Sequence, residues 1–320
     1  RFGLPENTPV LSCYEAGREG FWLHRYLEEN GIKNLIVDSS SIEVNRKAKR
    51  AKTDRLDARK LLTMLMRYDQ GEERVWSIVN VPSVDAEDRR HLHRELNTLK
   101  AERTRHINRI KGLLAGQGVS ISIRKDFLTC LDTIRLWDGS PLPLGLRARL
   151  EREYELMQVV IKQIKHLEAE RRELVRHSKR SDVELVRQLM RMKGIGIGSA
   201  WQWVMEFFAW REFSNRRQVG ALSGLTPTPY QSGDDSREQG ISKEGNVYVR
   251  SIAIQIAWGW LRYQPESKLT RWYEQRFGKG SKRLRKIGIV ALARRLLIDC
   301  WIYLETGLVP EGVELHQLQL

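Results

Sequence analysis

The first 80 residues alternate apolar and polar positions in a way that predicts an α/β domain. A short apolar run, Val10–Tyr14, has the length and composition of a β-strand. Helical spacing follows over residues 21–27, and an asparagine–glycine pair closes that segment as a helix C-terminus. The run Leu35–Val37 is typical of a second strand. The order strand, helix, strand predicts a βαβ unit, and a further helix is expected from about Asp54 to Tyr68.

The middle of the chain, residues 85–180, predicts long charged helices. In its second half, residues spaced alternately three and four apart form a heptad seam that is apolar except at Glu153 and Arg171. The seam consists of Leu150, Glu153, Met157, Val160, Ile164, Leu167, Arg171 and Leu174. This spacing predicts a coiled coil or a helical hairpin. The first half carries apolar residues that can face the seam, but we expect a second subunit to supply the partner helix.

Residues 181–310 predict a mainly α-helical domain with a substantial tryptophan-containing core, followed by a tail at 311–320. The segment Met192–Gly198 is similar to the turn of a helix-hairpin-helix, in which glycines let backbone N–H groups approach a phosphate beside Lys193. The alternative is a plain tight turn between two packed helices.

Charge narrows the choice of partners. Lys and Arg number 55 against 40 Asp and Glu, giving a net charge of +15 and a pI near 9.9, which favours polyanions. No apolar stretch of about 18 residues is present to span a membrane, and no secretion signal opens the chain. Cys13, Cys130 and Cys300 lie far apart, which suits a reduced cytosol without disulfides. His91 and His93 are expected at solvated positions.

A pair of carboxylates suggests a metal site. Asp54 and Asp57 are three residues apart, so they share one face of the expected helix, and Glu15 ends the first expected strand. Convergent carboxylates can hold Mg²⁺ against a phosphodiester. The alternative is a solvated helix start with Thr53 or Asp54 as N-cap.

Two basic runs are candidates for binding a nucleic-acid backbone. The first surrounds the acidic pair and contains Arg46, Lys47, Lys49, Arg50, Lys52, Arg55, Arg59 and Lys60. The second, around Lys282, Arg283, Arg285 and Lys286, is expected to be a flexible phosphate-binding segment. Trp272 precedes it and either stacks on bases or packs in the core.

A serine between glycines is a candidate nucleophile. Ser242 lies in the stretch Gly240–Asn246, and Ser232 is a second candidate on the same expected loop. The alternative is that Ser242 caps the following helix. In that helix Arg250 lies four residues from Asn246, so both side chains could face a phosphate.

These stretches together resemble one family, the DEDD-type transposases of insertion sequence 110 and its relatives in the 110/1111 group. The resemblance runs from about Leu11 to about Pro310 and rests on four stretches: Tyr14–Ala16, Val37–Val44 with Lys52–Arg59, Gly194–Gly196, and Leu222–Pro227 with Ser232-Gly233 and Gly240–Asn246.

The resemblance implies a RuvC-like domain of RNase H fold over residues 1–84, a coiled-coil dimerisation region over 85–180 and a transposase domain over 181–310. Glu15, Asp54 and Asp57 match the second to fourth acidic positions of the family's metal site, and Ser242 matches its serine. Residues 1–14 contain no Asp for the first acidic position, so the chain is expected to lack its N-terminal part.

The expected function is therefore RNA-guided DNA transposition in the bacterial cytoplasm. Partners would be donor and target DNA, a structured guide RNA and further copies of the chain, with Mg²⁺ as cofactor. Two alternatives stay open: a RuvC-like nuclease in which water attacks the phosphate, and a non-catalytic protein that only binds RNA or DNA.

Overall fold

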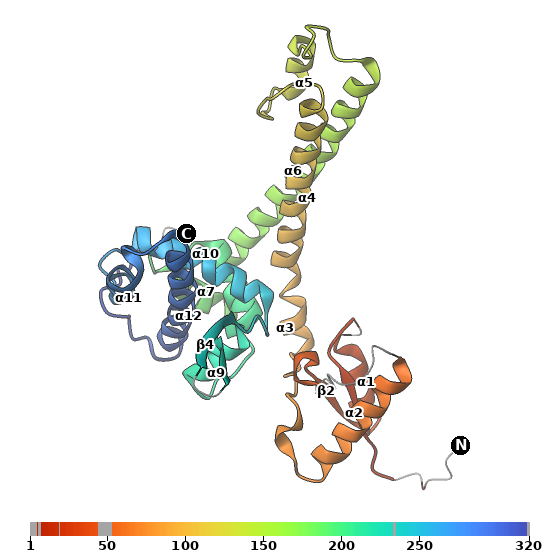
Figure 1. The fold of residues 1–320 in the computed structure, drawn as a ribbon, viewed down its shortest axis with the longest axis vertical. Coiled ribbons are helices and arrows are strands. Elements are labelled where there is room, and N and C mark those ends of the chain that lie inside the picture. Colours follow the sequence, from red (N-terminus) through yellow and green to blue (C-terminus); the bar gives the residue numbers. More distant parts are fainter. Residues whose placement is uncertain (1–4, 6–7, 19, 44–52, 233–234, 319–320) are drawn as a thin grey trace. The chain divides into compact units, whose positions relative to one another are not determined.

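A computed structural model describes residues 5, 8–18, 20–43, 53–232 and 235–318 of the chain (Figure 1). The chain divides into two compact units, Arg1–Ser83 and Val84–Leu320. Within the described ranges, no helix combines the length and apolar character needed to cross a membrane.

The first unit contains the expected βαβ unit. Strands β1 (Leu11–Glu15) and β2 (Lys33–Val37) are parallel, with Leu11 opposite Lys33 and Glu15 opposite Val37, and α1 (Trp22–Glu29) connects them. Helix α2 (Asp54–Asp69) buries Met64 and Leu65 against β2 and the segment that contains Trp76. Two short 3₁₀ turns, Ser39–Ser41 and Glu73–Val75, complete the unit. A two-stranded sheet does not define an RNase H fold, so that part of the expected fold class stays a prediction.

The second unit begins with α3 (Val84–Asp88) and a long helical hairpin (Figure 1). Helix α4 (His91–Ala115) packs against α6 (Leu144–His177), and the connection between them holds α5 (Phe127–Cys130) and the 3₁₀ turn Leu131–Thr133. The predicted seam of α6 is buried against apolar residues of α4 such as Leu96 and Ile110. This confirms the helical-hairpin alternative, in which the first half of the region packs on the seam. The expectation of a partner helix from a second subunit is wrong for this face.

The first polar break of the seam is satisfied across the hairpin. Glu153 is 8% exposed and lies 2.6 Å from Nδ1 of His106, and it also accepts a hydrogen bond from Arg109 of α4. A buried carboxylate is costly unless it is paired, so it selects the alignment of α4 and α6 that brings these groups together.

The rest of the second unit is mainly helical, as expected. Its elements in chain order are α7 (Ser181–Met190), α8 (Ile197–Trp203) continued by the π-helical turn Val204–Phe208, α9 (Arg216–Leu222), β3 (Pro227–Ser232), β4 (Asp235–Ile241), α10 (Val247–Tyr263), α11 (Lys268–Tyr273) continued by the π-helical turn Glu274–Gly278, and α12 (Lys282–Thr306). β3 and β4 form an antiparallel hairpin. The core contains Trp201, Trp203 and Trp260, each at most 1% exposed.

Charges placed in the α6 seam test whether its packing is intramolecular. Changing both Ile164 and Leu167 to Glu should lower the thermal unfolding midpoint strongly, because each change buries an unpaired charge against α4. Gln158→Glu is the matched control at an exposed position of α6, and it should leave the midpoint nearly unchanged. The fall in the midpoint should not depend on protein concentration. A fall that varies with concentration would show that the seam packs between subunits.

Candidate nucleic-acid and phosphoryl-transfer site

The end of β4 and the segment after it form a loop around Ser242, and this loop is hydrogen-bonded to the segment before β3. We call residues 240–246 the serine loop. The Ser242 N–H donates to the carbonyl of Thr226 at 2.9 Å, and the Asn246 N–H donates to the carbonyl of Leu222 at 3.2 Å. Lys243 occupies the left-handed backbone region with φ 60° and donates its N–H to the carbonyl of Gly224. Both ends of the loop are thus held by one neighbouring segment.

Two glycines make this close approach possible. A Cβ atom added at Gly224 would lie 1.9 Å from the carbonyl oxygen of Glu244, and one added at Gly245 would lie 2.2 Å from that of Leu222. Both glycines also have positive φ angles, of 68° and 85°. No other residue type fits either position without moving the neighbouring backbone.

Ser242 is not the N-cap of the following helix, so the capping alternative is wrong. The cap is Asn246, whose side-chain oxygen accepts hydrogen bonds from the N–H groups of Tyr248 and Val249. Within the described chain the Oγ atom of Ser242 is covered and has no hydrogen-bond partner. An unpaired buried hydroxyl costs about 1–3 kcal/mol, so this hydroxyl does not stabilise the loop.

A buried carboxylate fixes the far end of the serine loop. Glu206 is fully buried in the turn after α8, and its Oε2 accepts a hydrogen bond from the side-chain amide of Asn246 at 2.8 Å. The other partners come from α4. His93 Nε2 lies 2.8 Å from Oε1, and Arg94 donates to both carboxylate oxygens at 2.6 and 3.0 Å. Glu206 therefore connects α4 of the hairpin to the residue that ends the serine loop and begins α10.

The electrostatics of Glu206 follow from these contacts. Burial raises its pKa, but the hydrogen bonds from His93 and Arg94 outweigh that effect and lower the pKa to about 2. Because a carboxylate only accepts, His93 Nε2 must carry the hydrogen of this contact. His93 is 2% exposed, so the expectation that it is solvated is wrong, whereas His91 is exposed.

A basic cavity of about 880 Å³ borders the serine loop. We call it the serine-loop cavity. Gly240, Ile241 and Lys243 line it from the loop, and α12 contributes Lys282, Arg283, Lys286 and Arg294. The structure thus brings three of the four predicted basic residues of the second run to the loop that carries the predicted nucleophile. Arg285 is exposed but does not line the cavity.

The basic residues beside the cavity lie on a helix, so the expectation of a flexible segment is wrong. Ser281 caps α12 by accepting the N–H of Leu284 at 3.3 Å, so Lys282, Arg283 and Lys286 occupy its first turns. The first turn contains no acidic residue. Cations at a helix N-terminus face the positive end of the helix dipole, and a bound phosphate would offset both sources of positive potential.

The other predicted residues of this unit have structural contacts. Arg250 donates to the backbone carbonyl of Lys243 at 3.0 Å and thereby supports the serine loop. Lys193 forms an ion pair with Glu314, so the C-terminal tail packs on the glycine turn between α7 and α8. Ser232 ends β3. Of the first basic run, residues 46–52 lie outside the described residues, whereas Arg55, Arg59 and Lys60 lie on α2.

The predicted acidic residues lie in the first unit. Glu15 is the last residue of β1, and Asp54 and Asp57 occupy the first turn of α2, where Thr53 is the N-cap. All three carboxylates are exposed, and α2 packs on β1. Among the described residues, no three carboxylate, histidine or cysteine side chains are grouped closely enough to hold a metal ion. The carboxylates are of the right chemical type for Mg²⁺, but these three are not gathered around one point.

Two charged residues of the site, Glu206 and Arg294, were not predicted from the sequence. Glu206 lies in an apolar run, Val204–Phe208, and an acidic residue inside such a run is a signal for a buried pair. Arg294 was also missed, although it continues the cationic face of α12 toward the cavity.

Comparisons with known proteins identify the family to which this chain belongs. The model of the transposase IS116/IS110/IS902 family matches residues 186–273, which contain Glu206 and the whole serine loop. A putative transposase, y4rJ, of Sinorhizobium fredii is 43% identical over 314 residues, which cover 95% of this chain and 79% of that protein. The chain therefore belongs to the IS116/IS110/IS902 family of transposases, which confirms the resemblance found in the sequence.

More distant relatives carry names from the same group. The transposase for insertion sequence element IS1328 of Yersinia enterocolitica is 28% identical over 221 residues, covering 68% of this chain and 63% of that protein. The transposase for IS1111A of Coxiella burnetii is 25% identical over 257 residues, covering 78% and 65%. The chain thus spans slightly less than two thirds of the length of these two relatives.

The buried carboxylate gives a test of the site's architecture. Glu206→Gln should lower the free energy of unfolding at pH 7 by about 3 kcal/mol, because it removes the charge that pairs with Arg94 and His93. The folded pKa of about 2 lies below the ordinary 4.5, so the wild-type contribution is complete above pH 4.5 and is lost as the pH falls toward 2.

Denaturant unfolding across this pH range measures the effect. Glu173→Gln is the control, because Glu173 pairs with Arg176 on the exposed surface of α6 and should contribute less than about 1 kcal/mol. The difference between wild type and Glu206→Gln should shrink as the pH falls from about 5 to 2. A difference that stays constant would mean that Glu206 is not a paired carboxylate.

Proposed function

We propose that the protein is an RNA-guided DNA transposase that cuts and rejoins DNA strands with Ser242 as the nucleophile. The observation that carries this proposal is the cationic cavity beside the serine loop. Lys243 of the loop and four cationic side chains of α12 line a space large enough for several nucleotide atoms, together with apolar residues such as Ile287 and Val290. Family membership supports DNA as the substrate.

The proposed reaction is a transfer of the DNA phosphate to the serine. The Oγ atom of Ser242 forms a bond to phosphorus while the bond from phosphorus to one bridging sugar oxygen breaks. The hydroxyl proton passes to solvent, and the departing oxygen takes one up. The phosphoserine bond conserves the phosphoester, so attack by another sugar hydroxyl rejoins the strand without an energy source.

The residues around the cavity have a defined electrostatic role in this proposal. Lys282, Arg283 and Lys286 lie in the first turns of α12, so their charges and the helix dipole attract the same phosphate. Because Oγ is covered in the free protein, the serine loop must shift when DNA binds. The loop is held by backbone hydrogen bonds to residues 222–226, and these two segments would move together.

Mg²⁺ is the proposed cofactor, with Glu15, Asp54 and Asp57 as the carboxylates that would bind it. When bound, the ion would supply charge neutralisation at a phosphate. Glu15 closes a strand and the two aspartates open a helix of the same unit, and all three are exposed. Their oxygens are therefore accessible, but a bound ion would have to draw the three side chains together, because they are not gathered around one point in the free protein.

Guide RNA and self-assembly complete the proposal. The net charge of +15 is larger than the charge of the five cationic residues that line the serine-loop cavity. This excess supports RNA as a second polyanionic partner besides DNA. For assembly, Leu156 and Val159 of α6 are 54% and 59% exposed, so α6 carries apolar side chains on the side that α4 does not cover. We propose this face of the hairpin as the contact between subunits.

A metal-dependent nuclease is the second candidate function. The covered Oγ of Ser242 favours it, because a water molecule needs no movement of the serine loop to reach a phosphate. In that case the phosphate is released with free ends and no protein becomes attached to DNA.

Removal of the serine hydroxyl separates the two functions. Ser242→Ala should abolish strand joining and any covalent protein–DNA adduct while DNA binding stays within about twofold, because the change removes a nucleophile and little surface. Its thermal unfolding midpoint should stay equal or rise, since the hydroxyl is buried without a partner among the described residues. Adducts are detected by denaturing electrophoresis of labelled DNA.

Ser223→Ala is the matched control, because its hydroxyl donates to the carbonyl of Gly220 at 2.8 Å and it lies close to the serine loop through the neighbouring Leu222 and Gly224. This control should lose stability by about 1 kcal/mol and keep the chemistry. Cleavage by Ser242→Ala with free ends would support the nuclease. A loss of joining in Ser232→Ala alone would move the nucleophile to that residue.

The acidic positions are tested in the same assay. Asp54→Asn and Asp57→Asn should each reduce Mg²⁺-dependent cleavage by at least about 100-fold, because each removes one anionic oxygen ligand. Asp69→Asn, at the other end of α2, is the control and should keep full activity. Full cleavage by both first-turn variants would exclude this metal site.

A further inference from the structure

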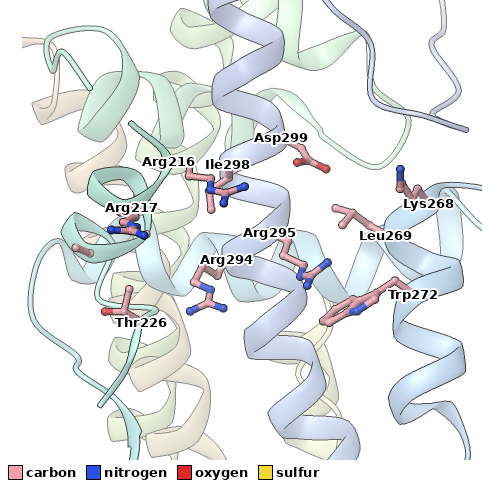
Figure 2. Close-up of a pocket in the computed structure, with 12 residues that line it drawn as sticks. Arg216, Arg217, Thr226, Lys268, Leu269, Trp272, Arg294, Arg295, Ile298 and Asp299 are labelled. Carbon is pink, nitrogen blue, oxygen red and sulfur yellow. The ribbon is translucent and has the colours of Figure 1, made fainter. Parts of the chain in front are cut away.

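A second cavity of about 900 Å³ lies along α12, no residue of the serine loop lines it, and no step proposed above uses it. Its lining residues come from α9, α11 and α12, and from Thr226 in the segment between α9 and β3. Figure 2 shows α12 between Arg217 of α9 and Lys268 and Trp272 of α11. We call it the Trp272 cavity. Arg294 lines both this cavity and the serine-loop cavity, so one strand could pass from one to the other along α12.

The charges of the Trp272 cavity suit a phosphate. Arg216, Arg217, Arg294 and Arg295 all line it, and within the described residues none of the four has a carboxylate within ion-pair distance. Four guanidinium groups around one space repel one another, and a bound anion would relieve that repulsion. Lys268 also lines the cavity, but it pairs with Glu311 at 2.8 Å.

The other wall of the cavity suits a nucleic-acid base. The guanidinium carbon of Arg295 lies 4.0 Å from the ring centroid of Trp272, and the ring of Phe277 meets Trp272 edge-on at 5.5 Å. A stacked arginine and tryptophan form a flat, polarisable platform of the kind on which unpaired bases stack. Trp272 is only partly buried, so the platform is accessible from the cavity.

One carboxylate at this wall can read the edge of a base. Asp299 lies on α12 one turn after Arg295 and points into the same space (Figure 2). Burial raises the pKa of Asp299 to about 6, against the opposing effects of Arg295 and Lys268. Its oxygens accept hydrogen bonds where the surrounding cations only donate, so the amino groups of adenine, cytosine and guanine are suitable partners.

We propose that the Trp272 cavity binds one unpaired nucleotide of a nucleic-acid strand, with the phosphate at the arginines and the base on the Trp272–Arg295 platform. The base must be unpaired, because its face and its donor edge are used together. This inference rests on the proposed function, in which the protein handles DNA and RNA strands. It adds a binding site that is separate from the nucleophile.

Fluorescence anisotropy with labelled single strands tests the site in the full chain. Each strand is compared with a copy that lacks one base and keeps its phosphates. Trp272→Ala should remove the advantage of the intact strand, which we expect to be about 5- to 150-fold in wild type. Trp272→Phe keeps a smaller ring and the core contacts and should retain part of the advantage. Circular dichroism checks that each variant is folded.

The phosphate-binding arginines are tested by salt dependence. Arg216→Ala combined with Arg217→Ala should flatten the slope of log affinity against log salt by about 0.7 for each phosphate that the variant no longer neutralises. Arg149→Ala combined with Arg152→Ala removes the same charge from the surface of α6 and should change the slope less. Matched DNA and RNA strands identify which nucleic acid supplies the nucleotide.

Strand binding by the wild-type protein separates a failure of the nucleotide site from a failure of the proposed function. If wild type binds strands but the Trp272 and arginine variants match it in base dependence and slope, the cavity is not a nucleotide site and the proposed function stands. If wild type binds neither DNA nor RNA strands, the proposed function fails and the inference fails with it.

Discussion

The hydrogen-bonded carboxylate of Glu206 is the interaction on which the second unit depends. It is fully buried, so its charge is tolerable only because His93, Arg94 and Asn246 surround it. These partners come from the long hairpin and from the start of α10, which are far apart in the sequence. The same carboxylate thus determines where α4 lies on the helical core and where the serine loop ends. The position of Ser242 relative to the helical core therefore depends on the hydrogen bonds of Glu206.

Helix α12 holds cationic side chains of both cavities at fixed positions along one helix. Its N-terminal turns present cations to the serine loop, and Arg294 and Arg295 lie about two turns further along, at the second cavity. Because a helix fixes the spacing of its side chains, these charges keep their separation whether or not a strand is bound. A flexible basic segment would lose conformational entropy on binding, and this arrangement avoids most of that loss.

The sequence predicted those features that depend on neighbouring residues. The βαβ unit, Thr53 as a cap of α2 and the buried seam of α6 all follow from local periodicity and capping chemistry. It did not predict what each buried surface packs against, because periodicity identifies a buried face and not its partner. The sequence therefore left two partners open for the seam, and the one expected from a second subunit was wrong. His93 was misjudged for a related reason, since its partner Glu206 is distant in the sequence. The capping alternative for Ser242 is excluded because Asn246 caps α10, whereas its role as nucleophile stays a prediction.

The two glycines that join the serine loop to residues 222–226 have a consequence for how this enzyme can vary. The two segments pack backbone against backbone, so each fills the space that a side chain on the other would need. Substitutions made singly at these positions would push the paired segment away and misplace the loop. New versions of this region, natural or designed, must therefore exchange both segments as one cassette, even though the hairpin of β3 and β4 separates them in the chain.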